Sequence, residues 1–190
     1  MLQKNTLICS ECNSISIRYD LGQTLQLPIT DFKKDPAPNY KTLKECLQTY
    51  SQPETLEGDN AYTCSTCNMK TTSTKTISLA SVPETLIIQL KRFIYNKKNL
   101  RHEKMDHTVD FPMNNLCIDR ENQTINYDLI GVIHHSGSIQ GGHYTASVKS
   151  LTDNKWYYCN DSSITPITPK LIHKKTAYLL FYQKVPTSVH

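Results

Sequence analysis

The alternation of apolar and polar residues divides the chain into many short strand candidates. Ile15 and Ile17 alternate with polar neighbours, and Leu25 and Leu27 continue this period of two, which is typical of strands with one buried face. The Thr-rich run 71–79 predicts a second strand that pairs beside the first. Further strand candidates follow at 85–95, 111–118, 127–135, 143–149, 155–160 and 176–184. Together they predict a mainly antiparallel sheet.

The remaining pattern indicates one helix and several loops. Thr42 and Glu45 form a T-x-x-E capping box, and apolar residues follow it at helical spacing. The stretch 31–40 carries two prolines and predicts a loop. The charged run 97–104 predicts a solvated loop, in which neither His102 nor His107 nearby is marked as a ligand. His134 and His135 precede a Ser-Gly turn, so we expect them at a solvated hairpin tip.

Length, charge and targeting signals restrict the class of protein. A chain of 190 residues with 38% hydrophobic content forms one domain or one lobe of a larger one. The net charge of +4 is mild and not gathered into a basic stripe, so nucleic acid is not the expected partner. No signal peptide or membrane span is recognisable, which predicts a cytosolic or nuclear location without membrane contact. Seven cysteines in such a reducing compartment indicate metal binding or catalysis.

Two C-x2-C pairs are the clearest chemical signal. Cys9 and Cys12 form the first pair, Cys64 and Cys67 the second, with 64 − 12 − 1 = 51 residues between them. Each pair forms a knuckle that presents two thiolates, and two knuckles give the closed tetrahedral ligand set of structural zinc. A thioredoxin-like redox role is the weaker alternative, because that chemistry needs one C-x2-C at a helix start.

A second constellation contains a histidine and an asparagine. His143 in GGHYTASVK and Asn160 in KWYYCNDSS are joined by the turn-like SLTDN, which predicts a hairpin that brings the two residues together. An imidazole oriented by a carboxamide is the base of a Cys-His-Asn triad. Gly141 and Gly142 would let another backbone approach beside the histidine. Taken alone, however, a strand histidine is more often structural.

The whole series of motifs resembles the ubiquitin-specific protease family. The cysteine knuckles, ETLIIQLKRF, YDLIGVIHHSGSIQGGHYTA, KWYYCNDSSITPI and AYLLFY occur in the family's order. The resemblance implies an α+β, mainly antiparallel fold with zinc-ribbon fingers and the palm sheet of a papain-like cysteine protease. It covers 7–184, with fingers at about 7–80, the palm at about 81–184 and a tail at 185–190.

The resemblance also implies roles for individual residues. His143 would be the general base and Asn160 its orienting partner, while Asp161 is an adjacent acid that shares this role in some members. Strand alternation places Asn160 and Asp161 on opposite faces, and Asn160 is favoured. Gly141, Gly142, Tyr144 and Trp156 would line the substrate channel. The expected partners are ubiquitin and ubiquitinated proteins, and the cofactor is structural zinc held by Cys9, Cys12, Cys64 and Cys67.

The family's nucleophile box, which reads like G-N-T-C-Y and precedes the fingers, does not occur in this sequence. Most of the thumb is therefore expected to be missing. Cys46 on the apolar helix face and Cys117 in an apolar stretch read as structural, and Cys159 points away from the triad position. Three readings remain open: a deubiquitinase whose sequence here begins after the nucleophile, a non-catalytic ubiquitin-binding module, and a zinc-ribbon protein- or nucleic-acid-binding module.

Overall fold

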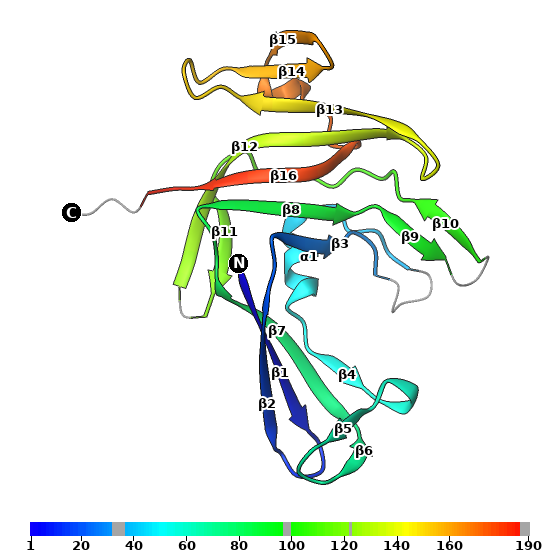
Figure 1. Cartoon of the computed structure of the whole chain (residues 1–190). Coiled ribbons are helices and arrows are strands. Elements are labelled where there is room, and N and C mark those ends of the chain that lie inside the picture. The colour runs from blue at the N-terminus through cyan, green and yellow to red at the C-terminus, as the bar shows by residue number, and fades with distance from the viewer. Residues whose placement is uncertain (32–36, 97–99, 122, 187–190) are drawn as a thin grey trace.

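The computed structural model describes residues 1–31, 37–96, 100–121 and 123–186. Within these residues the protein is mostly antiparallel β-sheet with a single α-helix and two short 3-10 helices, which confirms the mainly antiparallel prediction. Figure 1 shows a large sheet in the upper part of the molecule and a long, narrow sheet that extends below it. The N-terminus lies near the junction of the two sheets, whereas the C-terminal end of the described chain projects from one side of the large sheet (Figure 1).

The narrow sheet has four strands in the order β2-β1-β7-β4. They are β1 (Leu2–Cys9), β2 (Ile15–Leu21), β7 (Ser73–Ser81) and β4 (Glu54–Leu56). The 3-10 helix η1 (Gly58–Asn60) and a hairpin of β5 (Tyr62–Cys64) and β6 (Met69–Thr71) lie at its lower tip (Figure 1). The expected pairing of the Thr-rich strand is corrected here. β7 lies beside β1, which the sequence pattern did not indicate as a strand, and β1 separates β7 from β2.

The large sheet has eight strands in the order β15-β14-β13-β12-β16-β8-β3, with β11 paired to β12. They are β3 (Thr24–Pro28), β8 (Thr85–Lys91), β11 (Leu116–Arg120), β12 (Gln123–Gly137), β13 (Gly142–Lys149), β14 (Trp156–Asn160), β15 (Ser163–Ile167) and β16 (Ala177–Lys184). The 3-10 helix η2 (Pro169–Leu171) follows β15. All pairs are antiparallel except β3 with β8. β3 therefore belongs to the large sheet although it follows directly on β2, so the chain passes between the two sheets more than once.

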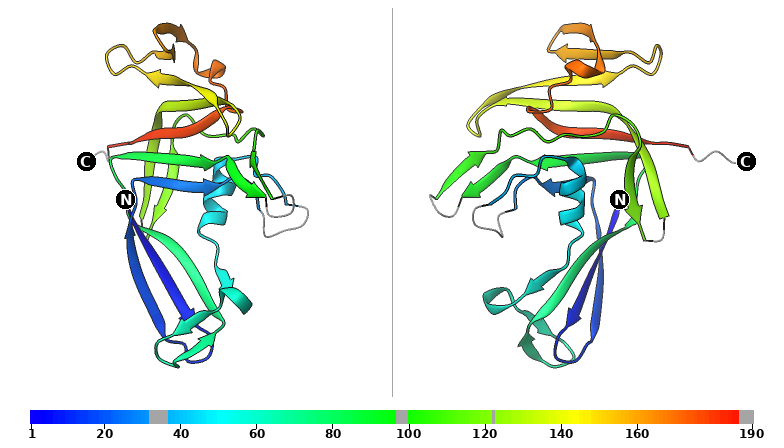
Figure 2. Two further views of the ribbon diagram at one scale, coloured as in Figure 1. Left: turned by 45° about the vertical axis from the view of Figure 1, so that its right-hand side comes forward. Right: turned by 180° about the vertical axis from the view of Figure 1, so that it is seen from behind.

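The hydrophobic core lies against one face of the large sheet. Alternate residues of three neighbouring strands are almost completely buried: Leu25 and Leu27 on β3, Leu86, Ile88 and Leu90 on β8, and Leu180 and Tyr182 on β16. Helix α1 (Leu43–Tyr50) packs here and is seen beside β3 in both views of Figure 2. Burying these side chains contributes roughly 1.5–3 kcal/mol each.

The capping box predicted from the sequence begins this helix. The Glu45 amide donates to Thr42 Oγ1 at 3.2 Å, and the Thr42 amide donates to the Glu45 carboxylate at 3.3 Å. Cys46 on the buried face is fully enclosed, and burial raises the pKa of its thiol to about 12. Its structural interpretation is confirmed. No helix in the described part of the chain is long and apolar enough to cross a membrane.

The charged run 97–104 is not a loop throughout. Residues 97–99 lie outside the described part, as do residues 32–36 of the loop predicted at 31–40. Arg101–Lys104 forms strand β10, which pairs with β9 (Phe93–Asn96) in a two-stranded sheet. The Lys104 side chain is only 8% exposed, because it turns inward toward the end of β12. The prediction of a loop is therefore wrong for the last four residues, and the prediction of a solvated side chain is wrong for Lys104, whereas Arg101 and His102 are exposed as expected.

Candidate functional site

The two cysteine knuckles share the same sequence pattern and the same backbone conformation. Each reads Cys-Ser-x-Cys-Asn and begins on the last residue of a strand, Cys9 on β1 and Cys64 on β5. The closing residues, Asn13 and Asn68, have φ of 56° and 55°, a conformation that asparagine tolerates well. Their amides donate to Cys9 O at 3.0 Å and to Cys64 O at 2.8 Å. Each knuckle therefore folds its two cysteines toward one side.

The two knuckles meet so that four sulfur atoms share one small space. The Sγ atoms of Cys9, Cys12, Cys64 and Cys67 all lie within 4.8 Å of one another. Cys12 Sγ is 3.8 Å from Cys64 Sγ, and Cys9 Sγ is 4.0 Å from Cys67 Sγ. Four thiolates bound tetrahedrally at about 2.3 Å from a metal would be about 3.8 Å apart. The four cysteines could therefore hold a metal ion.

The protonation of these thiols supports the same conclusion. The hydrogen bond to the Ser14 hydroxyl lowers the pKa of Cys64 to about 6. The neighbouring Cys12 thiol raises the pKa of Cys67 to about 12, and burial and the other two cysteines act in the same direction. Four adjacent thiolates repel one another, so all four can lose their protons only when a cation compensates their charge.

The predicted hairpin brings the histidine and the asparagine together. β13 and β14 pair antiparallel, with Ala146 opposite Cys159, so His143 near the start of β13 lies beside Asn160 at the end of β14. His143 Nε2 is 2.6 Å from Asn160 Oδ1, which confirms the expected proximity. Because Oδ1 only accepts, Nε2 carries the hydrogen, and in the neutral ring Nδ1 then has the lone pair. The His143 side chain is 52% exposed, so a second molecule has access to this ring.

Asp161 also lies near the imidazole, which corrects the argument from strand alternation. β14 ends at Asn160, and Asp161 has a φ of 49° in the turn that follows. This turn redirects its side chain, so that Asp161 Oδ2 lies 3.9 Å from His143 Nε2. The asparagine makes the hydrogen bond and the aspartate adds a negative charge nearby. Both residues can therefore stabilise a protonated imidazole.

The two glycines before the histidine differ in what they permit. A Cβ on Gly142 would collide with His135 Nε2 and Ser136 O, whereas a Cβ on Gly141 would meet nothing within 4 Å. Gly142 is thus required by the chain's own packing. Tyr144, which is 54% exposed, places its ring 4.7 Å from that of His135.

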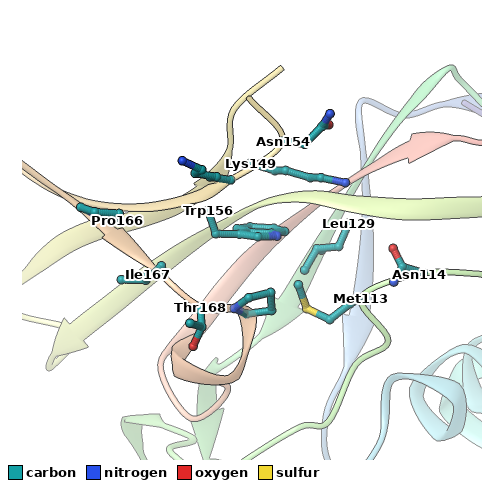
Figure 3. A pocket seen from close by; sticks show the side chains of 11 residues that line it. Met113, Asn114, Leu129, Lys149, Asn154, Trp156, Pro166, Ile167 and Thr168 are labelled. Atoms are coloured by element: carbon teal, nitrogen blue, oxygen red, sulfur yellow. The ribbon is translucent and has the colours of Figure 1, made fainter. Parts of the chain in front are cut away.

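Trp156, predicted to line the same channel, lies elsewhere. It starts β14, four residues before Asn160 and therefore about 13 Å from it along the strand. Its side chain is 6% exposed and forms a wall of a pocket of about 580 Å³. Figure 3 shows the indole facing Met113 and Leu129 in this pocket. The structure therefore does not bring Trp156 to His143.

His134 and His135 are buried, and the prediction of a solvated hairpin tip is wrong. They are 2% and 3% exposed and lie where the register of β12 against β16 shifts between Ile133 and His134. His134 Nε2 lies 2.9 Å from Ser147 Oγ, and its Nδ1 lies 3.2 Å from Thr176 Oγ1. Burial lowers the pKa of His134 to about 4. Burial and the Lys104 ammonium lower the pKa of His135.

The sequence patterns did not identify two groups near His143. One is the aromatic cluster of His135 with Phe93, Tyr144 and Tyr178, whose ring centroids lie 4.7 to 6.4 Å from that of His135. The other is the Lys104 ammonium, which contacts the end of β12. Phe93 and Lys104 are far from His143 in the sequence. They could have been placed near it only by predicting that β12 extends to Gly137 and which segments lie beside its end.

The fold and this geometry define a class of protein that combines a four-cysteine site with an exposed histidine–asparagine pair on a mainly antiparallel sheet. The model of the ubiquitin carboxyl-terminal hydrolase family matches residues 2–182. The chain belongs to this family, as its motifs indicated.

Curated relatives agree with this assignment. Ubiquitin carboxyl-terminal hydrolase 2 of Gallus gallus is 37% identical over 186 residues, which are 95% of this chain and 50% of that protein. Ubiquitin carboxyl-terminal hydrolase 12 of Saccharomyces cerevisiae is 42% identical over 147 residues, which are 74% of this chain and 12% of that protein. The chain therefore spans half or less of the length of these relatives.

Solved structures show the same fold. A chain of the SAGA DUB module with Ubp8, Sgf11, Sus1 and Sgf73, bound to monoubiquitin, matches with a TM-score of 0.80 and 30% identity. The match covers 98% of this chain and 41% of that one. The same module bound to ubiquitin aldehyde matches with a TM-score of 0.79 and 28% identity.

Proposed function

We propose that this chain supplies the zinc-bearing and histidine-bearing part of a deubiquitinating cysteine protease, which hydrolyses the (iso)peptide bond after the C-terminal glycine of ubiquitin. The observation that carries this proposal is the 2.6 Å contact between His143 Nε2 and Asn160 Oδ1 in a member of the ubiquitin carboxyl-terminal hydrolase family. The nucleophilic cysteine comes from outside these residues, because the family's cysteine box does not occur in the sequence.

In this mechanism His143 Nδ1 accepts the proton of the attacking thiol. Nε2 donates to Asn160, which fixes the tautomer and the ring orientation, and leaves Nδ1 as the basic atom. The imidazolium that forms is stabilised by Asp161, whose Oδ2 lies 3.9 Å from Nε2. Nδ1 then returns the proton to the leaving amine.

We propose zinc as the metal of the cysteine cluster, with a structural role. Four thiolates are the preferred closed ligand set of structural zinc, and they leave no open position for a substrate. When bound, the ion supplies charge compensation and a cross-link. Cys9, Cys12, Cys64 and Cys67 would then join β1 to the β5–β6 hairpin and stabilise the tip of the narrow sheet.

Ubiquitin is the proposed partner. The SAGA DUB modules with the same fold are bound to monoubiquitin or ubiquitin aldehyde. The matches to these two structures cover 98% of this chain. Its exposed His143 and Tyr144 side chains leave the site accessible to an extended peptide.

A second candidate function is a non-catalytic ubiquitin-binding module. The observation in its favour is the placement of the cysteines: four form the metal cluster, Cys46 is buried in the core, and Cys117 lies on β11. Cys159 pairs with Ala146 and Ile164, and its side chain points to the opposite face from Asn160. In the part of the chain that the structure describes, none of the seven cysteines is hydrogen-bonded to His143.

Ubiquitin binding tests both candidates against the zinc-ribbon reading. Titrating ¹⁵N-labelled ubiquitin with the zinc-loaded chain should shift ubiquitin amide resonances, including those of its C-terminal glycines. Replacing Tyr144 with Ala should weaken the shifts of these glycines, whereas the distant Lys184→Ala should not. If no resonance moves at millimolar concentrations of a folded chain, neither ubiquitin-dependent function holds, and a general zinc-ribbon module becomes the better account.

A further inference from the structure

Lys104 makes an unusual set of contacts for a lysine at the end of a charged run. Its Nζ donates to His135 O at 3.1 Å and to Gly137 O at 2.9 Å, and it pairs with Asp106 Oδ1 at 3.3 Å. An ammonium has three N–H donors, and these are three acceptors. The side chain is only 8% exposed, so this group is enclosed and fully paired.

The two carbonyls that Lys104 holds belong to the end of β12 that faces His143. In the antiparallel pair β12–β13, His135 lies opposite Tyr144, Ser136 opposite His143, and Gly137 opposite Gly142. The carbonyls of His135 and Gly137 therefore flank the partner of His143 on both sides. Holding these carbonyls therefore holds the part of β12 that is paired with His143 on β13.

The turn between β12 and β13 is tightly packed against itself, so its two ends are expected to move together. Gly137 has a φ of 116°, and a Cβ there would collide with the backbone of Gly141 and Gly142. Gly142 is in turn closed in by the His135 ring and Ser136 O. The Ser138 amide donates to Gly141 O at 2.9 Å. A shift at the end of β12 would therefore be transmitted to His143.

The segment that carries Lys104 is itself anchored by a buried cation. Arg92 is 0% exposed and donates from one terminal nitrogen, Nη1, to Met105 O at 2.8 Å and to His107 O at 2.9 Å. Its Nε donates to Ala177 O at 2.6 Å, at the start of β16. Lys104 thus projects from a backbone that is tied to the large sheet rather than from a free loop.

From this arrangement we infer that Lys104 is a positioning residue for His143, oriented by Asp106. It acts by holding the β12 end of the β12–β13 turn, so that His143 stays within hydrogen-bond distance of Asn160. The inference rests on the proposed function for its relevance to catalysis, but the geometry it predicts is measurable without activity.

The test compares Lys104→Met with wild type by NMR of the whole zinc-loaded chain. Methionine keeps most of the stem length and removes the three donors. We expect amide exchange in residues 138–143 to accelerate roughly tenfold or more, and nuclear Overhauser effects between the His143 ring and the Asn160 side chain to weaken. Lys184→Met, which removes an ion pair with Glu84 at the other end of β16, is the matched control and should change neither.

Unchanged exchange and unchanged His143–Asn160 contacts in Lys104→Met would overturn the inference. Faster exchange with intact His143–Asn160 contacts would also overturn it, because Lys104 would then stabilise the turn alone. If Lys104→Met does not fold, Asp106→Asn gives the same readouts in milder form, since Asp106 is 58% exposed. If Lys104→Met loses the His143–Asn160 contacts but the wild-type chain does not bind ubiquitin, the proposed function is refuted and this inference still holds.

Discussion

Cys12 and Cys64 lie 52 positions apart in the sequence, yet their Sγ atoms are 3.8 Å apart. This closure requires β1 and β5 to end side by side at the tip of the narrow sheet. We predict that the purified chain holds about one zinc ion and that Cys64→Ser releases it, because three thiolates in an exposed tip bind zinc more weakly than four. Metal analysis checks this, with Cys117→Ser as the control outside the cluster. Equal zinc in both variants would contradict the assignment of the ligands.

His143 should be dispensable for folding. Its ring is half-exposed and contacts Asn160 and the exposed Asp161 at the end of β14, so His143→Ala removes little buried area. We expect its thermal midpoint to stay within a few degrees of wild type, whereas Cys64→Ala should lower the midpoint by more, because the zinc cross-link is lost. Calorimetry of the three proteins checks this. A decrease in His143→Ala as large as that in Cys64→Ala would mean that His143 is structural.

Arg92 should be essential for stability. Its guanidinium donates to the carbonyls of Ala177, Met105, His107 and Lys174. Arg92→Met would leave several buried acceptors without donors, which costs about 3 kcal/mol or more in free energy of unfolding. Urea denaturation measures the loss. Arg18→Met, at an exposed position on β2, is the matched control and should cost under about 0.5 kcal/mol.

His134 should make the fold sensitive to acid. Its pKa is lowered to about 4 by burial, whereas an unfolded histidine titrates near 6.5. Between these values the unfolded chain binds more protons, so stability falls as pH drops from about 6.5 to about 4, by at most roughly 3 kcal/mol. Denaturation at a series of pH values checks this. His134→Gln should reduce the loss of unfolding free energy between about pH 6.5 and pH 4. If the variant and the wild type lose the same free energy over this range, His134 is not the source of the acid sensitivity.

Local patterns predicted the parts of the site that are local in space. The knuckles follow from C-x2-C spacing, and the His143–Asn160 contact follows from one hairpin with a turn-like SLTDN between its strands. The Thr42–Glu45 box likewise predicted where α1 begins.

The failures came from long-range pairing. His134 and His135 are buried by contacts with distant segments, such as Thr176 beside His134 and Phe93 beside His135, and the inward turn of Lys104 depends on β12 lying beside it. Asp161 approaches His143 only because the strand ends one residue earlier in a positive-φ turn. Neither periodicity nor spacing within one segment contains this information.

The most direct test of the proposed function restores the missing nucleophile. A segment of a family member that carries the G-N-T-C-Y-like cysteine box would be joined in front of this chain, and hydrolysis of a fluorogenic ubiquitin substrate would be measured once zinc content and thermal melting show that the hybrid is folded. We predict ubiquitin hydrolysis that His143→Ala reduces at least about a thousandfold. A folded hybrid that hydrolyses ubiquitin equally well with and without His143, or that binds ubiquitin but never hydrolyses it, would contradict the catalytic role of this histidine.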